Sequence, residues 1–444
     1  MKVAQLALDD YSNYGNFLQK YAIHTTIKKF ADDVEFLWYI QNTFWPEGND
    51  LPYPPKYLLE RYPHEAVRWW FCEAVRVSKI KEFADRYINT RFNLPYMEDI
   101  GDEYDFFVVG SDQVWNPSSG IISNLFLPFV PREKKIAYAA SIALTELPDD
   151  VKEYFRQGVK SFTHVSVREE NAVKIISELG LEPPLLVLDP VFLLTRDEWL
   201  KIARRPSWFN KKYERGYILT YYLRNFPPPE IESVAAELNL PVINLLDIKN
   251  FNHYAIGPEE FLYLFAHATL IYANSFHGIA FSTLFKRPFV NCEYDDETTQ
   301  SMGTRIPSLL KMFGLENRTV YTKEFNKIKS PLEIDFSRRD EILPQERMKA
   351  FKFLSKALGV EIPAELNGGM TRNDFRRNDF KKPRRLYRLF GLQKYLSEKL
   401  YNYGARRRRL LLSEDKSRRM YKLRQMRKGL SFAEFQGCNA RRVA

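Results

Sequence analysis

This chain contains few cysteines, and their small number indicates the kind of cellular compartment in which the protein functions. The 444 residues include three cysteines, Cys72, Cys292 and Cys438, which lie far apart in the sequence. An odd number of distant cysteines supports neither a disulfide framework nor a thiolate metal site. We therefore expect a protein of a reducing compartment, the cytoplasm.

Long apolar runs and glycine-rich phosphate motifs are missing as well. No stretch approaches the roughly 18 apolar residues needed to span a bilayer, and the N-terminal apolar run is too short for a signal peptide. The sequence contains no G-x-G-x-x-G, no G-x-x-x-x-G-K-[ST] and no G-x-S-x-G. Dinucleotide-binding, P-loop and serine-hydrolase functions therefore have no support.

Histidines with the spacing of metal ligands are also lacking. His24, His64, His164, His253 and His267 stand in no such pattern with one another or with nearby carboxylates. We assign them to surfaces or packing and expect no metal.

Positive charge is concentrated at one end of the chain. Residues 370–444 contain 23 Lys and Arg against 6 Asp and Glu, a net charge of +17, which leaves −7 of the total of +10 for residues 1–369. Basic clusters at 381–385 and 406–409 alternate with aromatic and aliphatic residues. This composition is typical of a segment that binds anionic lipid, so we expect docking at the inner face of the plasma membrane. A solvated tail without a fixed partner is the alternative, and nucleic acid is the least favoured partner because no RNA-binding module accompanies the charge.

What the chain does contain is a long alternation of strand and helix patterns, which indicates parallel βαβ units. Strands are expected at residues 2–8, 34–40, 105–109, 136–141, 163–167, 185–188, 216–223, 241–245, 269–273 and 288–291. Helices are expected at residues 16–30, 65–86, 169–179, 197–203, 229–238, 258–268, 277–285, 304–313 and 345–358. The predicted fold class is α/β, with two Rossmann-like domains facing a cleft and a basic C-terminal tail.

The predicted domains follow from this pattern and from the composition. The first spans residues 1–192 and includes an insertion at 43–95 that is rich in aromatics and prolines. The second spans 193–366, and its last helix is expected to cross back to the first. Residues 367–444 form the tail, which we expect to be helical or disordered.

One histidine, His277, occupies a position where parallel sheets bind ligands. It follows a buried strand directly and stands in the first turn of a predicted helix, beside Asn274, Ser275 and Gly278. Ligands of open α/β sheets lie outside the carboxyl ends of the strands, and a helix N-terminus offers N–H groups to an anion. A role in helix capping or packing alone is the alternative.

Polar loops follow two other predicted strands. The loop at residues 11–19 carries four candidates for binding an anion or a sugar: Asn13, Gly15, Asn16 and Gln19. The loop at 110–117 carries three candidates for hydrogen bonding and ring stacking with a carbohydrate: Ser111, Asp112 and Trp115. The alternatives are a simple turn for the first loop, and for the second an Asx turn with the tryptophan in the core.

Two arginines are candidates for holding an anion. Arg168 follows the strand at 163–167, and a guanidinium can hold a carboxylate or phosphate through two parallel hydrogen bonds. A surface ion pair is the alternative for this residue. Arg305, near the start of a helix in the second domain, is a weaker candidate of the same kind.

Taken in order, six segments resemble the polysaccharide pyruvyl transferase family over roughly residues 1–320. They are Asn13-Tyr14-Gly15-Asn16 with Leu18-Gln19, Gly110-Ser111-Asp112-Gln113-Val114-Trp115-Asn116-Pro117, Ser166-Val167-Arg168-Glu169, Leu188-Asp189-Pro190, Gly257-Pro258-Glu259-Glu260-Phe261 and Asn274-Ser275-Phe276-His277-Gly278.

The resemblance implies two Rossmann-like domains similar to GT-B glycosyltransferases, with the acceptor on the N-terminal side and the donor on the C-terminal side. It implies phosphoenolpyruvate as donor substrate, no further cofactor, and a sugar diol of a bacterial surface polysaccharide as acceptor, possibly in lipid-linked form. His277 suits a proton shuttle and Arg168 a clamp on the donor's carboxylate or phosphate.

One departure from the family concerns the donor. Family members often carry Arg-Leu-His-Gly where this chain reads Ser275-Phe276-His277-Gly278, so an arginine that binds the donor is missing at Ser275. Either Arg305 and the helix N-terminus supply the positive charge, or the donor is a different one. The alternative functions are a GT-B-like glycosyltransferase that uses a nucleotide sugar, and a non-catalytic glycan-binding or scaffold protein.

Overall fold

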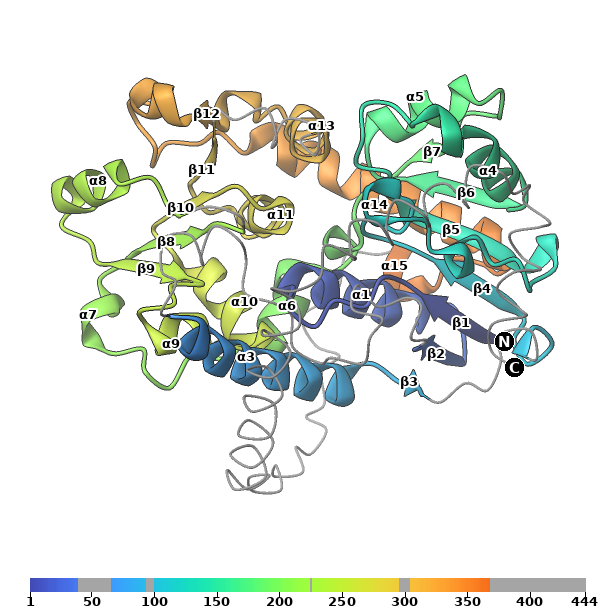
Figure 1. Ribbon diagram of the computed structural model, residues 1–444, viewed down its shortest axis with the longest axis horizontal. Coiled ribbons are helices and arrows are strands. Elements are labelled where there is room, and N and C mark those ends of the chain that lie inside the picture. The colour runs from blue at the N-terminus through green and yellow to red at the C-terminus, as the bar shows by residue number, and fades with distance from the viewer. Residues whose placement is uncertain (39–64, 93–99, 224–225, 295–303, 368–444) are drawn as a thin grey trace, which may run out of the picture. The chain divides into compact units, whose positions relative to one another are not determined.

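The computed structural model describes residues 1–38, 65–92, 100–223, 226–294 and 304–367. Met1–Gly368 forms one compact unit, which holds both sheets of the protein (Figure 1). The predicted tail and the insertion residues 43–64 and 93–95 lie outside the described part of the chain.

The first sheet has seven parallel strands in the order β3-β2-β1-β4-β5-β6-β7. Its strands are β1 (Lys2–Leu6), β2 (Asp33–Leu37), β3 (Thr90–Arg91), β4 (Phe106–Val109), β5 (Lys135–Ala140), β6 (His164–Val167) and β7 (Leu185–Leu186). Strands of a parallel sheet covered on both faces read as continuous apolar runs, and the Phe-Phe-Val-Val of β4 is such a run. The order 3-2-1-4-5-6 is that of a Rossmann sheet.

The second sheet has five parallel strands in the order β12-β11-β10-β8-β9. They are β8 (Ile218–Tyr221), β9 (Val242–Leu245), β10 (Leu270–Ala273), β11 (Phe289–Glu293) and β12 (Thr319–Tyr321). Counted from β8, this is the doubly wound order 2-1-3-4-5. The predicted fold class, α/β with two Rossmann-like parallel sheets, is confirmed.

Helices connect the strands. The α-helices are α1 (Tyr14–Ile27), α3 (Ala66–Tyr87), α4 (Asp149–Lys160), α5 (Glu170–Glu178), α6 (Arg196–Ile202), α7 (Lys211–Glu214), α8 (Glu230–Leu238), α9 (Phe251–Tyr254), α10 (Pro258–His267), α11 (Phe276–Leu284), α13 (Arg305–Phe313), α14 (Ser337–Leu358) and α15 (Ala364–Asn367). Short 3₁₀ turns are η3 (Pro117–Ser119), η4 (Ser123–Phe126), η5 (Arg132–Lys134), η6 (Pro190–Phe192), η7 (Glu316–Arg318) and η8 (Thr322–Lys327). In the part of the chain described here, no helix is both long and apolar enough to cross a bilayer.

Several elements differ from the expectation, among them two short strands and one long helix. The short strands β3 and β12 were not predicted, and α14 begins at Ser337 rather than after Pro344, which lies inside the helix. A proline is most compatible with the first turn of a helix, which is why the sequence favours a start beside it. Contacts hold the earlier turns in place, because Arg339 donates to the Leu284 carbonyl and Lys286 pairs with Asp340.

Each sheet has a switch point where its strand order reverses, between β1 and β4 in the first sheet and between β8 and β10 in the second. Ligands of such sheets bind outside the carboxyl ends of these strands. Figure 1 shows α1, α10 and α11 between the two sheets, and one apolar core includes side chains of all three. This core brings the loops at the two switch points together.

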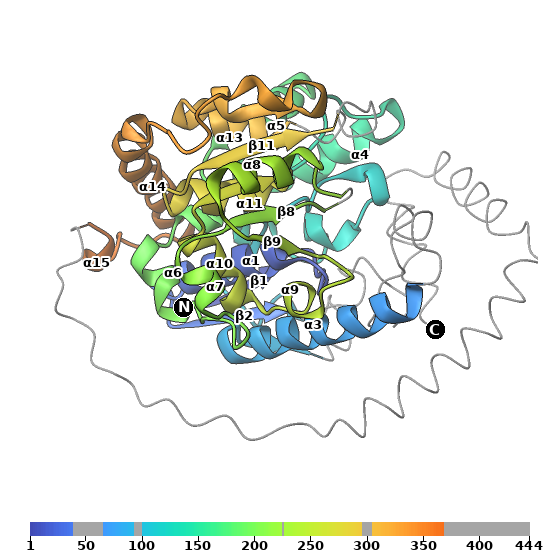
Figure 2. The ribbon, with the colours of Figure 1, turned by 90° about the vertical axis from the view of Figure 1, so that its left-hand side faces the viewer.

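The unit has two halves, one around each sheet, and two long helices contact both halves. α14 packs Ala350 and Leu354 into a core with Val3 and Ile136 of the first sheet, while its first turns bind residues near the second. α3 runs past α1 and α9 along one edge of the molecule (Figure 2). The two halves are therefore joined by more than the chain that links them.

Candidate active site

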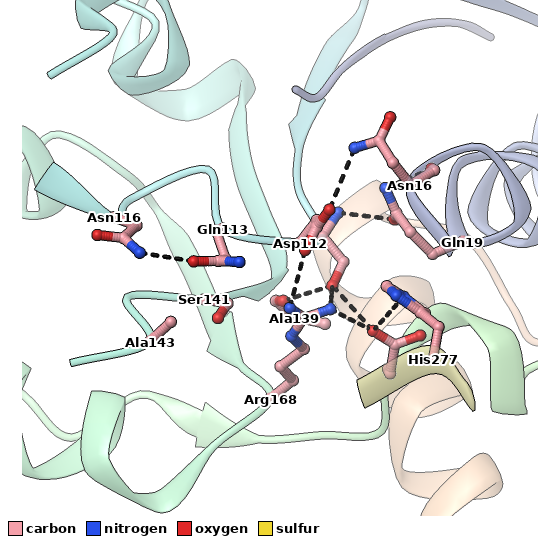
Figure 3. A network of polar contacts seen from close by, with 12 residues as sticks. Asn16, Gln19, Asp112, Gln113, Asn116, Ala139, Ser141, Ala143, Arg168 and His277 are labelled. Carbon is pink, nitrogen blue, oxygen red and sulfur yellow. Dashed lines mark hydrogen bonds and ion pairs between the residues drawn. The ribbon is translucent and has the colours of Figure 1, made fainter. Parts of the chain in front are cut away.

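Five segments meet where the two switch points come together, and Figure 3 shows their side chains as one polar network. They are the start of α1, the loop after β4, the end of β6, η6 and the start of α11. Asn13 caps α1 by accepting from the Asn16 N–H at 3.3 Å, and Ser275 caps α11 by accepting from the Gly278 N–H at 3.4 Å. These caps fix where the two helices begin.

Arg168 lies at the centre of the network. Its Nη1 donates to Asp189 Oδ2 at 2.6 Å, and its Nη2 donates to Asp112 Oδ1 at 3.0 Å. Glu169 Oε2 is 3.7 Å from its Nε, and the arginine side chain is 0% exposed. Burial opposes the charge, but the three carboxylates together raise the pKa of the Arg168 guanidinium above its ordinary value.

These surroundings show what Arg168 binds within the protein. A guanidinium that binds a carboxylate or phosphate of a donor must present free N–H groups to it. Here Nη1 and Nη2 bind protein carboxylates, and an incoming anion would face three acidic groups around a single arginine. Arg168 is therefore not a surface ion pair, because it binds acids inside the protein.

The carboxylate of Asp189 connects Arg168 with His277. Asp189 Oδ2 is 3.9 Å from His277 Nε2, which is buried and has no hydrogen-bond partner among the described residues. Burial lowers the pKa of the His277 imidazole below its ordinary value, while Asp189 and Asp112 act in the opposite direction. The net effect is a lowered pKa, which favours the neutral form of the imidazole.

Asp112 is held from two sides. Arg168 binds its Oδ1, and Asn16 Nδ2 donates to its Oδ2 at 3.1 Å. Burial alone would raise the pKa of the Asp112 carboxyl, but the positive charge of Arg168 holds it well below its ordinary value. Asp112 therefore carries a fixed negative charge. Its backbone is in the left-handed region, with a φ of 63°.

The first turns of α1 support the loop after β4 and the ring of His277. Gln19 Oε1 accepts from the Ser111 N–H at 3.3 Å, and the Ser111 hydroxyl donates to the Ala139 carbonyl at 2.8 Å. Gly15 lies so close to His277 that a Cβ at position 15 would stand 2.0 Å from His277 Nδ1. A glycine is required here because the imidazole occupies the space of a side chain.

The start of α11 carries the remaining predicted residues of the second half. Asn274 Oδ1 accepts from the Leu223 N–H at 3.2 Å, so it joins the loops that follow β10 and β8. Gly278 packs against Ala273 and Tyr221, where a Cβ would lie 3.2 Å from each of two side-chain carbons. These contacts hold the turn that presents His277.

Arg305 supplies a second positive charge near this turn. Its guanidinium carbon is 5.8 Å from the centre of the Phe276 ring, and the Arg168 guanidinium carbon is 4.5 Å from the same ring. Its charge also lowers the pKa values of Asp112 and His277. Arg305 therefore lies close to the start of α11, beside the network.

The comparison with family models decides the family. The model of polysaccharide pyruvyl transferases matches residues 13–296, which is more than half of the chain and includes every segment of the network. The chain belongs to the polysaccharide pyruvyl transferase family. No curated protein matches the chain in a sequence search.

Solved structures similar to this family member come from several carbohydrate enzymes. UDP-GlcNAc 2-epimerase from Neisseria meningitidis bound to UDP-GlcNAc is 10% identical, with 80% of this chain and 100% of that chain covered and a TM-score of 0.39. MurG from Acinetobacter baumannii is 11% identical, with 81% and 99% covered and a TM-score of 0.39. Anabaena HepE in complex with UDP and glucose is 12% identical, with 81% and 97% covered and a TM-score of 0.40.

One predicted substrate-binding residue of this pyruvyl transferase family member is a core residue. Trp115 is 1% exposed, its ring stacks on Phe126 with centroids 5.6 Å apart, and its indole N–H donates to the Leu125 carbonyl. Its face is therefore not open to a sugar, and the expectation is corrected in favour of the core alternative.

The prediction for this family member omitted two acidic residues that the structure brings into the network. Asp189 follows β7 and caps η6, while Glu169 Oε1 accepts from the Ser141 hydroxyl and from the Ile142 and Ala143 N–H groups at 2.8–3.0 Å. Their positions directly after predicted strands are the signal that could have identified them.

No metal centre accompanies these acids in the described residues. Nowhere in that part of the chain do three or more His, Cys, Asp or Glu side chains cluster as ligands of a metal ion would. The groups that the network offers for chemistry are therefore the imidazole, the carboxylates and the two guanidinium groups.

Proposed function

We propose that this family member transfers the pyruvyl group of phosphoenolpyruvate to two hydroxyls of one sugar, forming a ketal and releasing phosphate. The acceptor is a bacterial surface polysaccharide intermediate. The family match supports the class of reaction, and the geometry of the site supports the roles of the residues.

One observation supports the proposal most directly: the buried Nε2 of His277 lacks a hydrogen bond and lies 3.9 Å from Asp189 Oδ2. A buried polar atom without a partner is uncommon in folded proteins. A hydroxyl group that donates a hydrogen bond to His277 Nε2 and lies near Asp189 Oδ2 would supply the missing partner. A sugar hydroxyl is such a group, and Nε2 is then positioned to take its proton.

The reaction has a simple proton balance. The first hydroxyl adds to the central carbon of phosphoenolpyruvate, and His277 Nε2 takes the hydroxyl proton and delivers it to the methylene carbon, which becomes the methyl group. The carbon–oxygen bond to phosphate then breaks, and the second hydroxyl closes the ketal. The proton of the second hydroxyl leaves with the phosphate, so the two hydroxyl protons account for the new methyl hydrogen and for hydrogen phosphate.

The carboxylates have different tasks in this scheme. Asp189, held by Arg168 at 2.6 Å, stabilises the imidazolium that forms when His277 takes a proton. Asp112 accepts hydrogen bonds from the diol, because its pKa is held well below the ordinary value and it remains ionised. Arg168 is a positioning residue that fixes both acids.

The positive charge that binds phosphoenolpyruvate comes from the second half of the unit. Arg305 lies beside Phe276 at the start of α11, and the first-turn N–H groups of a helix have no partners within the helix. Together they replace the arginine that the family often carries at the position of Ser275. We assign them the phosphate and carboxylate of phosphoenolpyruvate.

The test combines binding with turnover. Phosphoenolpyruvate is expected to raise the melting temperature while UDP does not, since a ligand stabilises the state that binds it. Phosphate release from phosphoenolpyruvate is expected only with the lipid-linked glycan fraction present, and it is expected to be lost in His277→Ala. The matched control is His267→Ala, which changes an exposed histidine on α10.

Three outcomes would contradict the proposal. Stabilisation by UDP alone would favour a glycosyltransferase that uses a nucleotide sugar. Full phosphate release by His277→Ala would show that His277 takes no part in the reaction. Binding of glycan by the wild-type protein without turnover of phosphoenolpyruvate would indicate a binding protein.

A lipid-linked acceptor agrees with the composition of the C-terminal tail. We propose that the excess of positive charge in residues 370–444 brings the protein to the anionic inner face of the plasma membrane, where such an acceptor is made.

A further inference from the structure

A cluster of four buried side chains lies behind the first turn of α1, outside the network around Arg168. Tyr14, Glu73, Arg76 and Tyr254 come from α1, α3 and α9, and each is at most 5% exposed. Arg76 binds Glu73 through two hydrogen bonds of 2.9 and 2.6 Å, and the Tyr254 hydroxyl donates to Glu73 at 2.9 Å. The Arg76 guanidinium carbon lies 5.4 Å from the Tyr14 ring centre and 5.2 Å from that of Tyr254.

Tyr14 connects this cluster to the second half of the unit. Its hydroxyl donates to the Ile256 carbonyl at 3.0 Å, and its ring lies against Phe261 with centroids 4.9 Å apart. Ile256 and Phe261 lie at the start of α10, whereas Tyr14 is the first residue of α1. The first turn of α1 is thus fixed to an element of the second sheet.

The next two residues of α1 contact the candidate site. Gly15 lies against the His277 ring, and Asn16 donates to Asp112. Three consecutive residues therefore join the cluster, the imidazole and a carboxylate. A shift of this turn would move Gly15 away from the ring and Asn16 away from the acid together.

We propose that the cluster of Tyr14, Glu73, Arg76 and Tyr254 positions the first turn of α1 against His277, so that helix α3 of the insertion sets the packing of the reaction centre. These four are positioning residues and do not contact the reacting atoms. The inference rests on the function proposed above only in naming His277 the reacting group.

The burial of His277 gives a readout that needs no substrate. The ring is faced by Asp189 after β7, Asp112 after β4, Arg168 after β6 and Arg305 on α13, and α1 contributes Gly15. Burial is the largest influence on its titration and lowers its pKa. A looser first turn of α1 would admit water, so the pKa of His277 would rise.

The experiment compares two tyrosine variants of the full chain. Tyr14→Phe removes the hydroxyl that binds Ile256 across the two halves. Tyr217→Phe removes an equally buried hydroxyl that donates to the Leu264 carbonyl at 2.7 Å within the second half, and it is the matched control. The His277 signal of the histidine-labelled protein, assigned by its loss in His277→Ala, is titrated by NMR.

We expect a higher pKa for His277 in Tyr14→Phe and an unchanged value in Tyr217→Phe, with His164 as an internal reference. Tyr254→Phe, which removes one hydrogen bond at the other side of the cluster, is expected to act in the same direction. An unchanged His277 titration in both Tyr14→Phe and Tyr254→Phe would overturn the inference.

Turnover supplies the second measurement. The kcat of pyruvyl transfer is expected to fall roughly tenfold in Tyr14→Phe, with a smaller change in the KM for phosphoenolpyruvate, because misplacement by a fraction of an ångström affects the reacting geometry more than binding. If the wild-type protein shows no pyruvyl transfer, the proposed function fails while the NMR titration still decides the positioning role.

Discussion

The imidazole of His277 occupies the space that a side chain at position 15 would need. A Cβ at position 15 would lie 2.0 Å from His277 Nδ1 and 2.2 Å from His277 Cγ. It would also lie 2.7 Å from the His277 Cβ, which stays in place when the ring rotates about the Cα–Cβ bond. Ring rotation therefore cannot relieve all three contacts. The histidine and the glycine therefore form one unit, although 262 positions separate them in the sequence. A change at the smaller residue acts on the larger one.

Gly15→Ala is expected to displace His277 and to reduce the kcat of pyruvyl transfer by roughly 100-fold, since a shift of about 1 Å in a reacting group has that effect. The control is Gly158→Ala on α4, where a Cβ would lie 2.4 Å from Phe126 Cδ1 and contact neither His277 nor a carboxylate of the network. Both variants are expected to melt earlier, but only the first should lose turnover. Wild-type kcat in Gly15→Ala would contradict the assignment of His277.

At the scale of elements, Glu169 joins the end of β6 to the loop that follows β5. Glu169→Ala removes the acceptor of the Ser141 hydroxyl and of the Ile142 and Ala143 N–H groups, and buried donors without partners are costly. We expect the free energy of unfolding, measured in urea, to fall by about 3 kcal/mol. Glu170→Ala is the control, because it loses only an exposed ion pair with Lys311 and should change stability by less than about 1 kcal/mol. Equal losses in the two variants would contradict the role of the Glu169 carboxylate.

The elements also show what the sequence can and cannot predict. Strands β4 and β10 were predicted within one residue because each is an apolar run that ends at small or polar residues. β3 and β12 were not predicted, because two or three residues make no run and their pairing with β2 and β11 defines them.

The same limit applies to the site. Parallel strands bring their carboxyl ends to one edge, so the sequence could predict that Asp112 and Arg168 lie close together. Asp189 follows the neighbouring predicted strand and could have been added on the same ground, but its 2.6 Å contact with Arg168 depends on tertiary packing. For the same reason, the sequence alone does not show that Arg168 is fully buried among three carboxylates.

For the whole molecule, the distribution of charge separates the tail from the described unit. A protein truncated after Gly369 keeps both sheets but loses a net charge of +17. We expect the full chain to sediment with vesicles of anionic lipid at low salt, and we expect the truncated protein to remain in the supernatant. Vesicles of zwitterionic lipid are the control, and equal sedimentation of the two proteins with anionic vesicles would contradict docking by the tail.

Helix α14 has a consequence for how the chain is made. The first sheet consists of residues up to Leu186, but a face of its core is completed by Ala350, Phe351 and Leu354, which pack with Val3, Ile136 and other sheet residues. On the ribosome, the N-terminal half therefore waits for more than 150 further residues before that face is covered. Since exposed apolar surface promotes aggregation, the nascent protein is expected to depend on chaperones until α14 emerges.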